Sequence, residues 1–433
     1  MSVAARADTP QRVIRAYIVT NALFTLAASL IWAINTIFLE QRGGLNLFQV
    51  MLVNTAFVVA QMVCEVQTGV IADTIGRKAS YLLSIATIII STILYVLTPI
   101  VGWGFWGFVV ASLIIGLGFT FQTGAVDAWM VDALDYLGWE GPKDRVFAWG
   151  GMGTGAAVLV GSLLGGLLGQ IDLVIPYLVR AAVLVAAFIL VLFVVHDTGF
   201  EPRPLKLSTF GSETRKIFDA GVTYGWHSRV VRPLLFTSLI TGLFYIYGFY
   251  SWQPYVLQLL GKNAIWLLGV VQAGSSLAGI AGNALVMRVR GRAATQRESS
   301  RLLITITYSS ALIVGAIGLV GIALHQPGIV PAAIAIGLWL GWGVIFGIFM
   351  PVRANFINEY IPSAQRATVL SLDSLFGDAG GAVGQPVLGY VSTQVSISAA
   401  WTIGAVCVAL AGPLYGAAGR AARAQEADRP TGS

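Results

Sequence analysis

Long apolar runs separated by short polar segments dominate the sequence. Each run matches the roughly 20 apolar residues that a helix needs to cross a bilayer. Six runs precede a longer polar stretch and six follow it, near 15–38, 47–71, 79–100, 105–131, 147–169, 174–195, 233–257, 264–287, 301–324, 329–352, 367–391 and 397–418. The pattern predicts an all-α integral membrane protein made of two six-helix bundles.

The polar stretch and the chain end divide the sequence further. We expect an N-terminal bundle over 1–195, a cytoplasmic linker over 196–232, a C-terminal bundle over 233–418 and a cytoplasmic tail over 419–433. Pro142-Lys-Asp-Arg145 before the fifth run recurs loosely as Pro362-Ser-Ala-Gln-Arg366 before the eleventh. This echo suggests a duplication with pseudo-twofold symmetry, and transporters commonly place their substrate site between such repeats.

Composition and charge agree with a membrane protein. Charged residues make up 11% of the chain, against roughly 25% in soluble domains. If the N-terminus is cytoplasmic, 23 of the 26 basic residues fall in inner segments, and the outer loops keep only Arg42 and Lys262. This segregation follows the positive-inside rule. The basic residues behind the net charge of +6 therefore indicate membrane topology and not nucleic-acid binding. Arginine far outnumbers lysine, which is typical of a GC-rich bacterial genome. Together with the charge segregation, this predicts a multi-pass protein of a bacterial inner membrane with both termini in the cytoplasm.

Cysteines and histidines offer little chemistry. Cys64 and Cys407 both lie in apolar runs, so neither a disulfide nor a metal site is indicated. His196, His227 and His325 lie at run ends or in loops, which argues against a histidine relay. We expect no cofactor and no enzymatic activity.

The segment between the second and third runs carries the most informative motif, Gly69-Val-Ile-Ala-Asp73-Thr-Ile-Gly76-Arg77-Lys78. Glu65, Gly69 and Asp73 are spaced four residues apart and share one helix face. Gly69 permits close packing, Asp73 can accept hydrogen bonds from helix N-terminal amides, and Gly76 makes the turn. The alternative is a pair of ordinary positive-inside basic residues beside a turn, which the full ten-residue pattern disfavours.

This motif resembles the signature loop of the major facilitator superfamily, and the 6+6 layout extends the resemblance over nearly the whole chain. The resemblance implies a central cavity lined by helices 1, 4, 7 and 10, which two rocking halves expose alternately. It also implies a cytoplasmic latch that includes Lys78. In that latch Asp73 meets the start of helix 11 at Arg366, and Arg77 meets an acidic residue at the end of helix 4. The acidic candidates are Asp127, Asp132 and Asp135, and we place Asp132 in the latch.

Two elements of the drug/proton antiporters in that family are altered here. Gly161-Ser-Leu-Leu-Gly165-Gly166 resembles their Gly-Pro-x-x-Gly-Gly element with Ser162 in place of proline, but ordinary small-residue packing explains it equally well. Ser112 stands where the antiporters carry arginine before Gly116-Leu-Gly118. The second-half copy of the signature loop, near Gly282 to Arg292, has Val286 in place of the aspartate.

Ionisable residues inside the apolar runs are functional candidates, because each costs at least about 2.5–3.5 kcal/mol in hydrocarbon. Asp378 lies twelve residues beyond Arg366, or roughly 18 Å into helix 11 at 1.5 Å per residue. Burial there favours the neutral form, which suits a proton carrier, although a purely structural carboxyl is the alternative. The proton-coupling candidates are Asp378, Asp127, Glu65 and Asp373. For Asp127 and Glu65 we favour latch and packing roles, and Arg180 is expected to snorkel to the outer surface.

Aromatic residues concentrate in the runs expected to line the cavity. Interfacial aromatic belts explain some of them. The remaining cavity candidates are Trp32, Asn35, Gln122, Tyr245, Tyr247, Trp252, Trp342 and Phe346. A pocket rich in ring faces suits an amphipathic, cationic or planar compound better than a sugar.

The sequence therefore predicts a secondary transporter that exports such a compound in exchange for protons. Its expected partners are the small-molecule substrate, protons and the lipid bilayer, and we expect a monomer. Uptake or facilitated diffusion of a nutrient by the same fold is the first alternative, favoured by Ser112 and Ser162. A membrane enzyme or sensor is the second, and we see no clustered catalytic residues that favour it.

Overall fold

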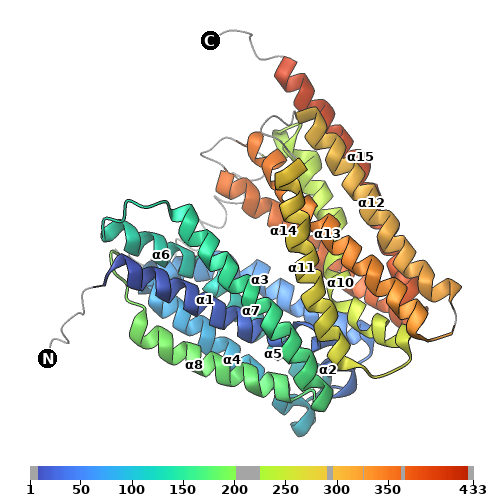
Figure 1. The fold of residues 1–433 in the computed structure, drawn as a ribbon, viewed down its shortest axis with the longest axis horizontal. Helices are drawn as coiled ribbons and strands as arrows, with labels where there is room; N and C mark the ends of the chain where they lie inside the picture. Colours follow the sequence, from blue (N-terminus) through green and yellow to red (C-terminus); the bar gives the residue numbers. More distant parts are fainter. Residues whose placement is uncertain (1–7, 201–224, 290–295, 325, 362–365, 428–433) are drawn as a thin grey trace. The chain divides into compact units, whose positions relative to one another are not determined.

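The computed structural model describes residues 8–200, 225–289, 296–324, 326–361 and 366–427. Figure 1 shows a chain of long helices connected by short loops. The helices before the linker are α1 (Pro10–Trp32), α2 (Asn35–Gln41), α3 (Leu47–Ile75), α4 (Arg77–Val101), α5 (Gly104–Gln122), α6 (Ala125–Tyr136), α7 (Lys143–Ile171) and α8 (Ile175–Val194). Those after it are α10 (Val231–Leu260), α11 (Ile265–Val289), α12 (Gln296–Ala323), α13 (Ile329–Glu359), α14 (Arg366–Gln394) and α15 (Ile397–Ala427).

Most of these helices are long and apolar enough to span a membrane. Among the described residues eleven candidate spans satisfy both conditions, with α5 and α6 counted as one. Helix α14 has 29 residues but is more polar, since it carries Asp373, Asp378 and Gln385. With α14 included, the chain is the predicted all-α integral membrane protein of two six-helix bundles.

The chain forms two compact units. The first comprises Met1–Gly44, Ala56–Glu213 and Ile265–Ala273, and the second comprises Leu45–Thr55, Thr214–Ala264 and Gly274–Ser433. The beginning of α3 thus groups with the second unit and the beginning of α11 with the first. The central part of the expected linker, 201–224, lies outside the described residues, as do parts of the Pro362 loop, the second-half copy of the signature loop and the tail.

Two of the helical spans are interrupted. Ala33 and Ile34 separate α1 from α2. Thr123 and Gly124 separate α5 from α6, and Gly124 has a φ of 76°. A residue with a side chain rarely adopts this left-handed conformation, so glycine permits the break.

The packing of α7 on α1 depends on glycine. A Cβ added at Gly161 would collide with Ser29 of α1, and one at Gly165 would collide with the backbone of Leu30. Figure 1 shows these two helices crossing in close contact. The altered antiporter element therefore acts in this structure as a small-residue packing surface.

A second glycine seam joins α10 to α14 in the other unit. A Cβ at Gly242 would meet the carbonyl of Gly377, and Cβ atoms at Gly380 and Gly384 would meet the carbonyls of Leu239 and Leu243 on α10. Each approach is too close for any side chain, so these two helices meet backbone to backbone. Helices α12 and α15 also run side by side along most of their length (Figure 1).

The expected snorkelling of Arg180 is wrong. The residue is only 2% exposed in α8, and its charge interacts with Tyr95 and Tyr177. Its distance from the helix end suggested a position near the outer surface. The side chain instead turns into the first unit, where Tyr177 and Tyr95 stack with ring centroids 5.9 Å apart.

Candidate transport site

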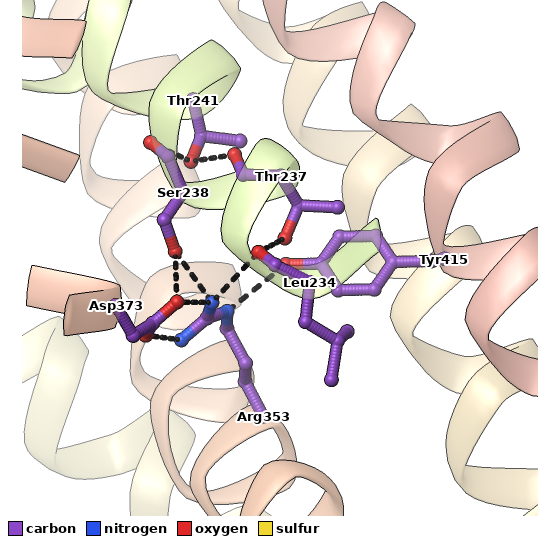
Figure 2. Close-up of polar contacts among 7 residues, drawn as sticks. All are labelled: Leu234, Thr237, Ser238, Thr241, Arg353, Asp373 and Tyr415. Atoms are coloured by element: carbon purple, nitrogen blue, oxygen red, sulfur yellow. Dashed lines mark hydrogen bonds and ion pairs between the residues drawn. The ribbon is translucent and has the colours of Figure 1, made fainter. Parts of the chain in front are cut away.

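A buried ion pair ties four helices of the second unit together (Figure 2). Arg353 of α13 donates from Nη1 to one carboxylate oxygen of Asp373 on α14 at 2.6 Å and from Nη2 to the other at 2.7 Å. Nη2 also donates to Ser238 Oγ of α10 at 2.5 Å and to the Leu234 carbonyl at 3.3 Å, while Nε donates to the Tyr415 hydroxyl of α15 at 3.2 Å. We call Ser238, Arg353, Asp373 and Tyr415 the α13 clamp.

The α13 clamp satisfies its own hydrogen bonds. Arg353 is 14% exposed and Asp373 11% exposed at the side chain, and Ser238 donates to Asp373 at 2.7 Å. The planar guanidinium matches the carboxylate with two parallel hydrogen bonds, the strongest arrangement for such a pair. Removing one partner of a buried pair is strongly destabilising, so the clamp holds α10, α13, α14 and α15 in one arrangement.

The surrounding sequence places the clamp. The α10–α14 glycine seam brings Ser238 within reach of Asp373. Pro351 lies inside α13 two residues before Arg353, and Pro413 lies two residues before Tyr415 in α15. A proline within a helix removes one backbone hydrogen bond and bends the helix. Arg353 and Tyr415 therefore each follow closely on a position where the helix lacks one backbone hydrogen bond.

Arg353 is among the basic residues counted in the inner segments, directly after the tenth apolar run at 329–352. Helix α13 continues to Glu359, so the arginine lies within the helix and faces the bundle. Asp373 stays a candidate for proton coupling, but it would have to separate from Arg353 before it could exchange a proton.

A ladder of aromatic rings runs from the clamp along α10 and α13. Phe349 contacts Tyr415 of the clamp with ring centroids 6.3 Å apart, and Tyr245 contacts Phe349 at 6.5 Å. The rings continue through Phe346 and Trp342 to Trp339 and Trp252, with successive centroids 5.0–5.7 Å apart. We call Tyr245, Trp252, Trp339, Trp342, Phe346 and Phe349 the aromatic ladder.

The ladder contains buried donors without an acceptor. The indole N–H groups of Trp252, Trp339 and Trp342 have no hydrogen-bond partner among the described residues, although these residues are 8% exposed or less. An unpaired buried donor typically costs about 1–3 kcal/mol. The amide nitrogen and oxygen of Gln385 on α14 also have no hydrogen-bond partner in the described part of the chain. The second unit therefore combines ring faces with unused hydrogen-bonding capacity.

Other predicted cavity residues have structural partners. The Tyr247 hydroxyl is within 2.5 Å of Ser392 Oγ, and the residue is fully buried. Asn35 accepts a hydrogen bond from Tyr177 at 2.8 Å. Trp32 and Gln122 are half-buried. Of the predicted residues, the structure brings together Tyr245, Trp252, Trp342 and Phe346.

The signature loop forms a charged cluster in the first unit. Arg77 lies 2.8 Å from Asp73 and 3.8 Å from Asp132. Asp132 is thus the acidic neighbour of Arg77 among the three candidates. Asp127 instead accepts a hydrogen bond from Tyr17 at 2.8 Å, and Asp135 pairs with Lys143 at 2.5 Å.

Asp197 supports the turn of this loop. Its carboxylate accepts a hydrogen bond from the Lys78 backbone amide at 2.8 Å, at the first turn of α4. Gly76 has a φ of 105°, and a Cβ there would collide with Asp197. The predicted turn at Gly76 is therefore present, and a carboxylate caps the helix that follows, as is favourable at a helix N-terminus.

The remaining candidates are more loosely placed. An added Cβ at Gly69 meets no atom within 4 Å, so the expected close packing is not found within this unit. Glu65 and Arg366 are exposed. Asp378 is half-buried and has an interaction partner. Its role in proton coupling, like that of Glu65, stays a prediction.

Sequence reasoning missed several residues of these clusters. Ser238, Tyr415, Tyr17 and Asp197 carry no motif, and each forms a hydrogen bond with a residue at least 62 positions away. It also missed Glu40 in α2, outside the candidate spans, where burial raises the pKa of the carboxyl to about 7. Among the described residues no group of His, Cys, Asp or Glu is arranged to hold a metal ion.

Comparisons with known proteins identify the fold and the family of this chain. No curated protein sequence matches the chain. The crystal structure of the nucleoside transporter NupG aligns with a TM-score of 0.74 at 12% identity, covering 94% of this chain and 98% of that one. A POT family transporter in complex with 5-aminolevulinic acid aligns with a TM-score of 0.72 at 14% identity, covering 93% and 94%. A D-xylose–proton symporter aligns at 0.68 and 12%, covering 94% and 97%.

These likenesses, all below 25% identity, show a shared fold. The family model described as Major Facilitator Superfamily matches residues 17–385. That range includes the signature loop, the aromatic ladder and every residue of the α13 clamp except Tyr415. This chain belongs to the major facilitator superfamily of membrane transporters.

Proposed function

We propose that the protein is a secondary transporter that moves a planar, amphipathic organic compound by alternating access, in the direction of proton-coupled export. The aromatic ladder is the observation that carries the proposal. Its ring faces favour stacking on a flat molecule, since offset ring pairs gain about 0.5–1.5 kcal/mol beyond their buried area. Its unpaired indole N–H groups favour hydrogen-bond acceptors on that molecule.

The ladder and the α13 clamp are in direct contact through Phe349 and Tyr415. A substrate that displaces the ladder rings would therefore act on Tyr415 and, through it, on Arg353. The clamp contains one of the four carboxylates proposed for proton coupling, Asp373. Loading of the ladder and separation of the clamp are in this proposal two parts of one transport cycle.

Proton-coupled uptake of a planar metabolite is the second candidate. Position 112, where the drug antiporters carry arginine, is a buried serine whose hydroxyl lies 2.5 Å from the Tyr95 hydroxyl. Residue 112 itself therefore supplies no cation. The structurally similar proteins include a nucleoside transporter and a D-xylose–proton symporter, which are consistent with this alternative.

The proposal is tested with purified protein in liposomes under a pH gradient of either polarity. The probes are ethidium, a cation with a planar aromatic ring system, uridine, a neutral compound with a planar base, and xylose, which has no flat ring. Export predicts that ethidium moves against the direction of proton flow. Symport of uridine with protons would favour the uptake alternative. Equal transport of all three probes, or transport of xylose alone, would refute a ladder that selects planar compounds.

Tryptophan variants connect any transport to the ladder. Trp342→Phe keeps a ring and removes the unpaired N–H, and we expect about two- to tenfold weaker apparent affinity, the value of one hydrogen bond. Trp401→Phe is the matched control, because its indole N–H already donates to Ser251 at 3.1 Å. Equal effects of the two variants on affinity would show that the unpaired donors do not bind substrate.

A further inference from the structure

A cavity of about 320 Å³ opens between the first turns of α1 and the last turn of α8, within the first unit. None of its lining residues belongs to the signature loop. Arg12 and Arg15 of α1 line it, together with a single carboxylate, that of Asp8. Its apolar lining comes from both helices and consists of Ala16, Val19, Leu190, Phe193 and Val194.

The charge balance of this cavity favours an anion. Arg12 and Arg15 are exposed, and neither forms an ion pair among the described residues. Asp8 is already engaged, because it accepts a hydrogen bond from Thr198 at 2.6 Å and lies 3.4 Å from His196 Nδ1. Two cations therefore face the opening while its carboxylate is occupied. The positive end of the α1 dipole adds to the same field.

The apolar lining identifies the environment of the cavity. Phe193 is 71% exposed, Val19 46% and Val194 38%. In a membrane-spanning chain such residues face acyl chains. Val19 lies four residues after Arg15 and seven after Arg12, so the three share one face of α1. That face thus changes from cationic to lipid-facing within two turns.

We propose that this cavity binds an anionic phospholipid. Its phosphate would contact Arg12 and Arg15, and the first carbons of its acyl chains would lie against Val19, Leu190 and Phe193. A free anion would satisfy the cations but gain nothing from the apolar lining, whereas a zwitterionic lipid would fill the lining with little net attraction to the cations. Only an anionic lipid matches both halves of the cavity.

The test is native mass spectrometry of the purified full-length protein with phosphatidylglycerol or phosphatidylcholine of identical acyl chains. A basic residue near an anionic surface contributes about a factor of five in affinity, so the double variant Arg12→Gln/Arg15→Gln should bind phosphatidylglycerol about 25-fold more weakly. Phosphatidylcholine binding should be unchanged. The control is Arg420→Gln/Arg423→Gln, two exposed arginines of α15 with the same spacing and the same loss of charge, which should have no such effect.

Two further arms separate the sources of the anion and protect against misfolding. In the wild-type protein, inorganic phosphate or glycerol phosphate at millimolar concentration should not displace phosphatidylglycerol, and displacement would show a site for a soluble anion. Phe193→Ser should weaken binding of the long-chain lipid and leave the α1 charges intact. Equal affinity of the wild-type protein for the two lipids, or equal losses in the test and control arginine variants, would overturn the proposal.

Discussion

Breaking the α13 clamp at one carboxylate should destabilise the second unit strongly. Asp373→Asn preserves size and removes the charge, so Arg353 remains 14% exposed without a counter-charge. Ser238, Tyr415 and the Leu234 carbonyl can still accept hydrogen bonds. The variant therefore isolates the ionic part of the interaction.

The expected loss can be worked from the geometry. Opposite charges about 4 Å apart interact by about 4 kcal/mol at an effective dielectric constant of 20. Measured losses for one partner of a buried pair are about 3–5 kcal/mol. Each kcal/mol shifts the melting temperature by about 2–4 °C in a unit of 150–250 residues. We therefore expect a decrease on the order of 10 °C.

Thiol labelling during thermal unfolding measures this shift. Cys64 and Cys407 are free and half-buried, so a thiol-reactive fluorophore reports their exposure as the purified protein unfolds. The control is Asp172→Asn, because the Arg42–Asp172 pair is 47% and 39% exposed at its side chains. Exposed pairs contribute at most about 1 kcal/mol, which predicts a shift of a few degrees.

A double variant decides whether the pair is coupled. Arg353→Gln/Asp373→Asn leaves no buried charge at the clamp, so it should be more stable than either single variant. If Asp373→Asn melts no lower than Asp172→Asn, or if the double variant loses the sum of the single losses, the clamp does not act as described.

Four other measurements test the remaining assignments. Arg77→Ala should leave the protein in the membrane and reduce transport about tenfold or more by shifting the balance of transport states; normal transport would show that the signature loop is dispensable. Asp378→Asn should abolish the pH dependence of transport while substrate still binds, and an unchanged pH profile would assign the proton to another carboxylate. Because burial raises the pKa of Glu40 to about 7 from 4.5, folding disfavours its ionised form, and stability should fall as pH rises between these values. The total loss in the free energy of unfolding is about 3 kcal/mol at 1.36 kcal/mol per pKa unit. Glu40→Gln should remove the corresponding decrease of the melting temperature with pH, and a decrease that persists in this variant would assign it to another group. In cysteine-free protein, Gly44→Cys should react with an impermeant thiol reagent added outside cells and Glu140→Cys should not, and the reverse result would invert the predicted topology.

Local spacing explains what the sequence could reveal. The apolar runs predicted the helices because each helix must be apolar along its own length. Arg77 and Asp73 are four residues apart on one helix face, a spacing that permits the observed pair, whereas the family resemblance implied that Asp73 meets the start of helix 11. Asp127, Asp132 and Asp135 all lie near the end of the fourth predicted span, so the sequence could not choose between them. The side-chain geometry identifies Asp132 as the neighbour of Arg77.

The clamp could not be predicted in this way. Arg353 follows Pro351, and a proline with a nearby basic residue indicates a helix end, yet α13 continues to Glu359. The partner of Arg353 lies on a different helix, and Ser238 is 135 positions from Asp373. The predicted snorkelling of Arg180 was wrong for a related reason, because distance from a helix end does not determine which way a side chain turns.

The glycine seam between α10 and α14 should tolerate far fewer substitutions during evolution than the aromatic ladder. Gly242, Gly380 and Gly384 admit no side chain without forcing two backbones apart, so substitutions there should be purged whatever the substrate. The ladder rings on α13 contact one another, and the atoms nearest to an added Cβ at these glycines are backbone atoms of Gly377, Leu239 and Leu243. Descendants of this chain could therefore exchange Trp342 or Phe346 for other residues and acquire new substrates while the seam keeps the helices in register. Diversity among related sequences should accumulate in the ladder long before it reaches the seam.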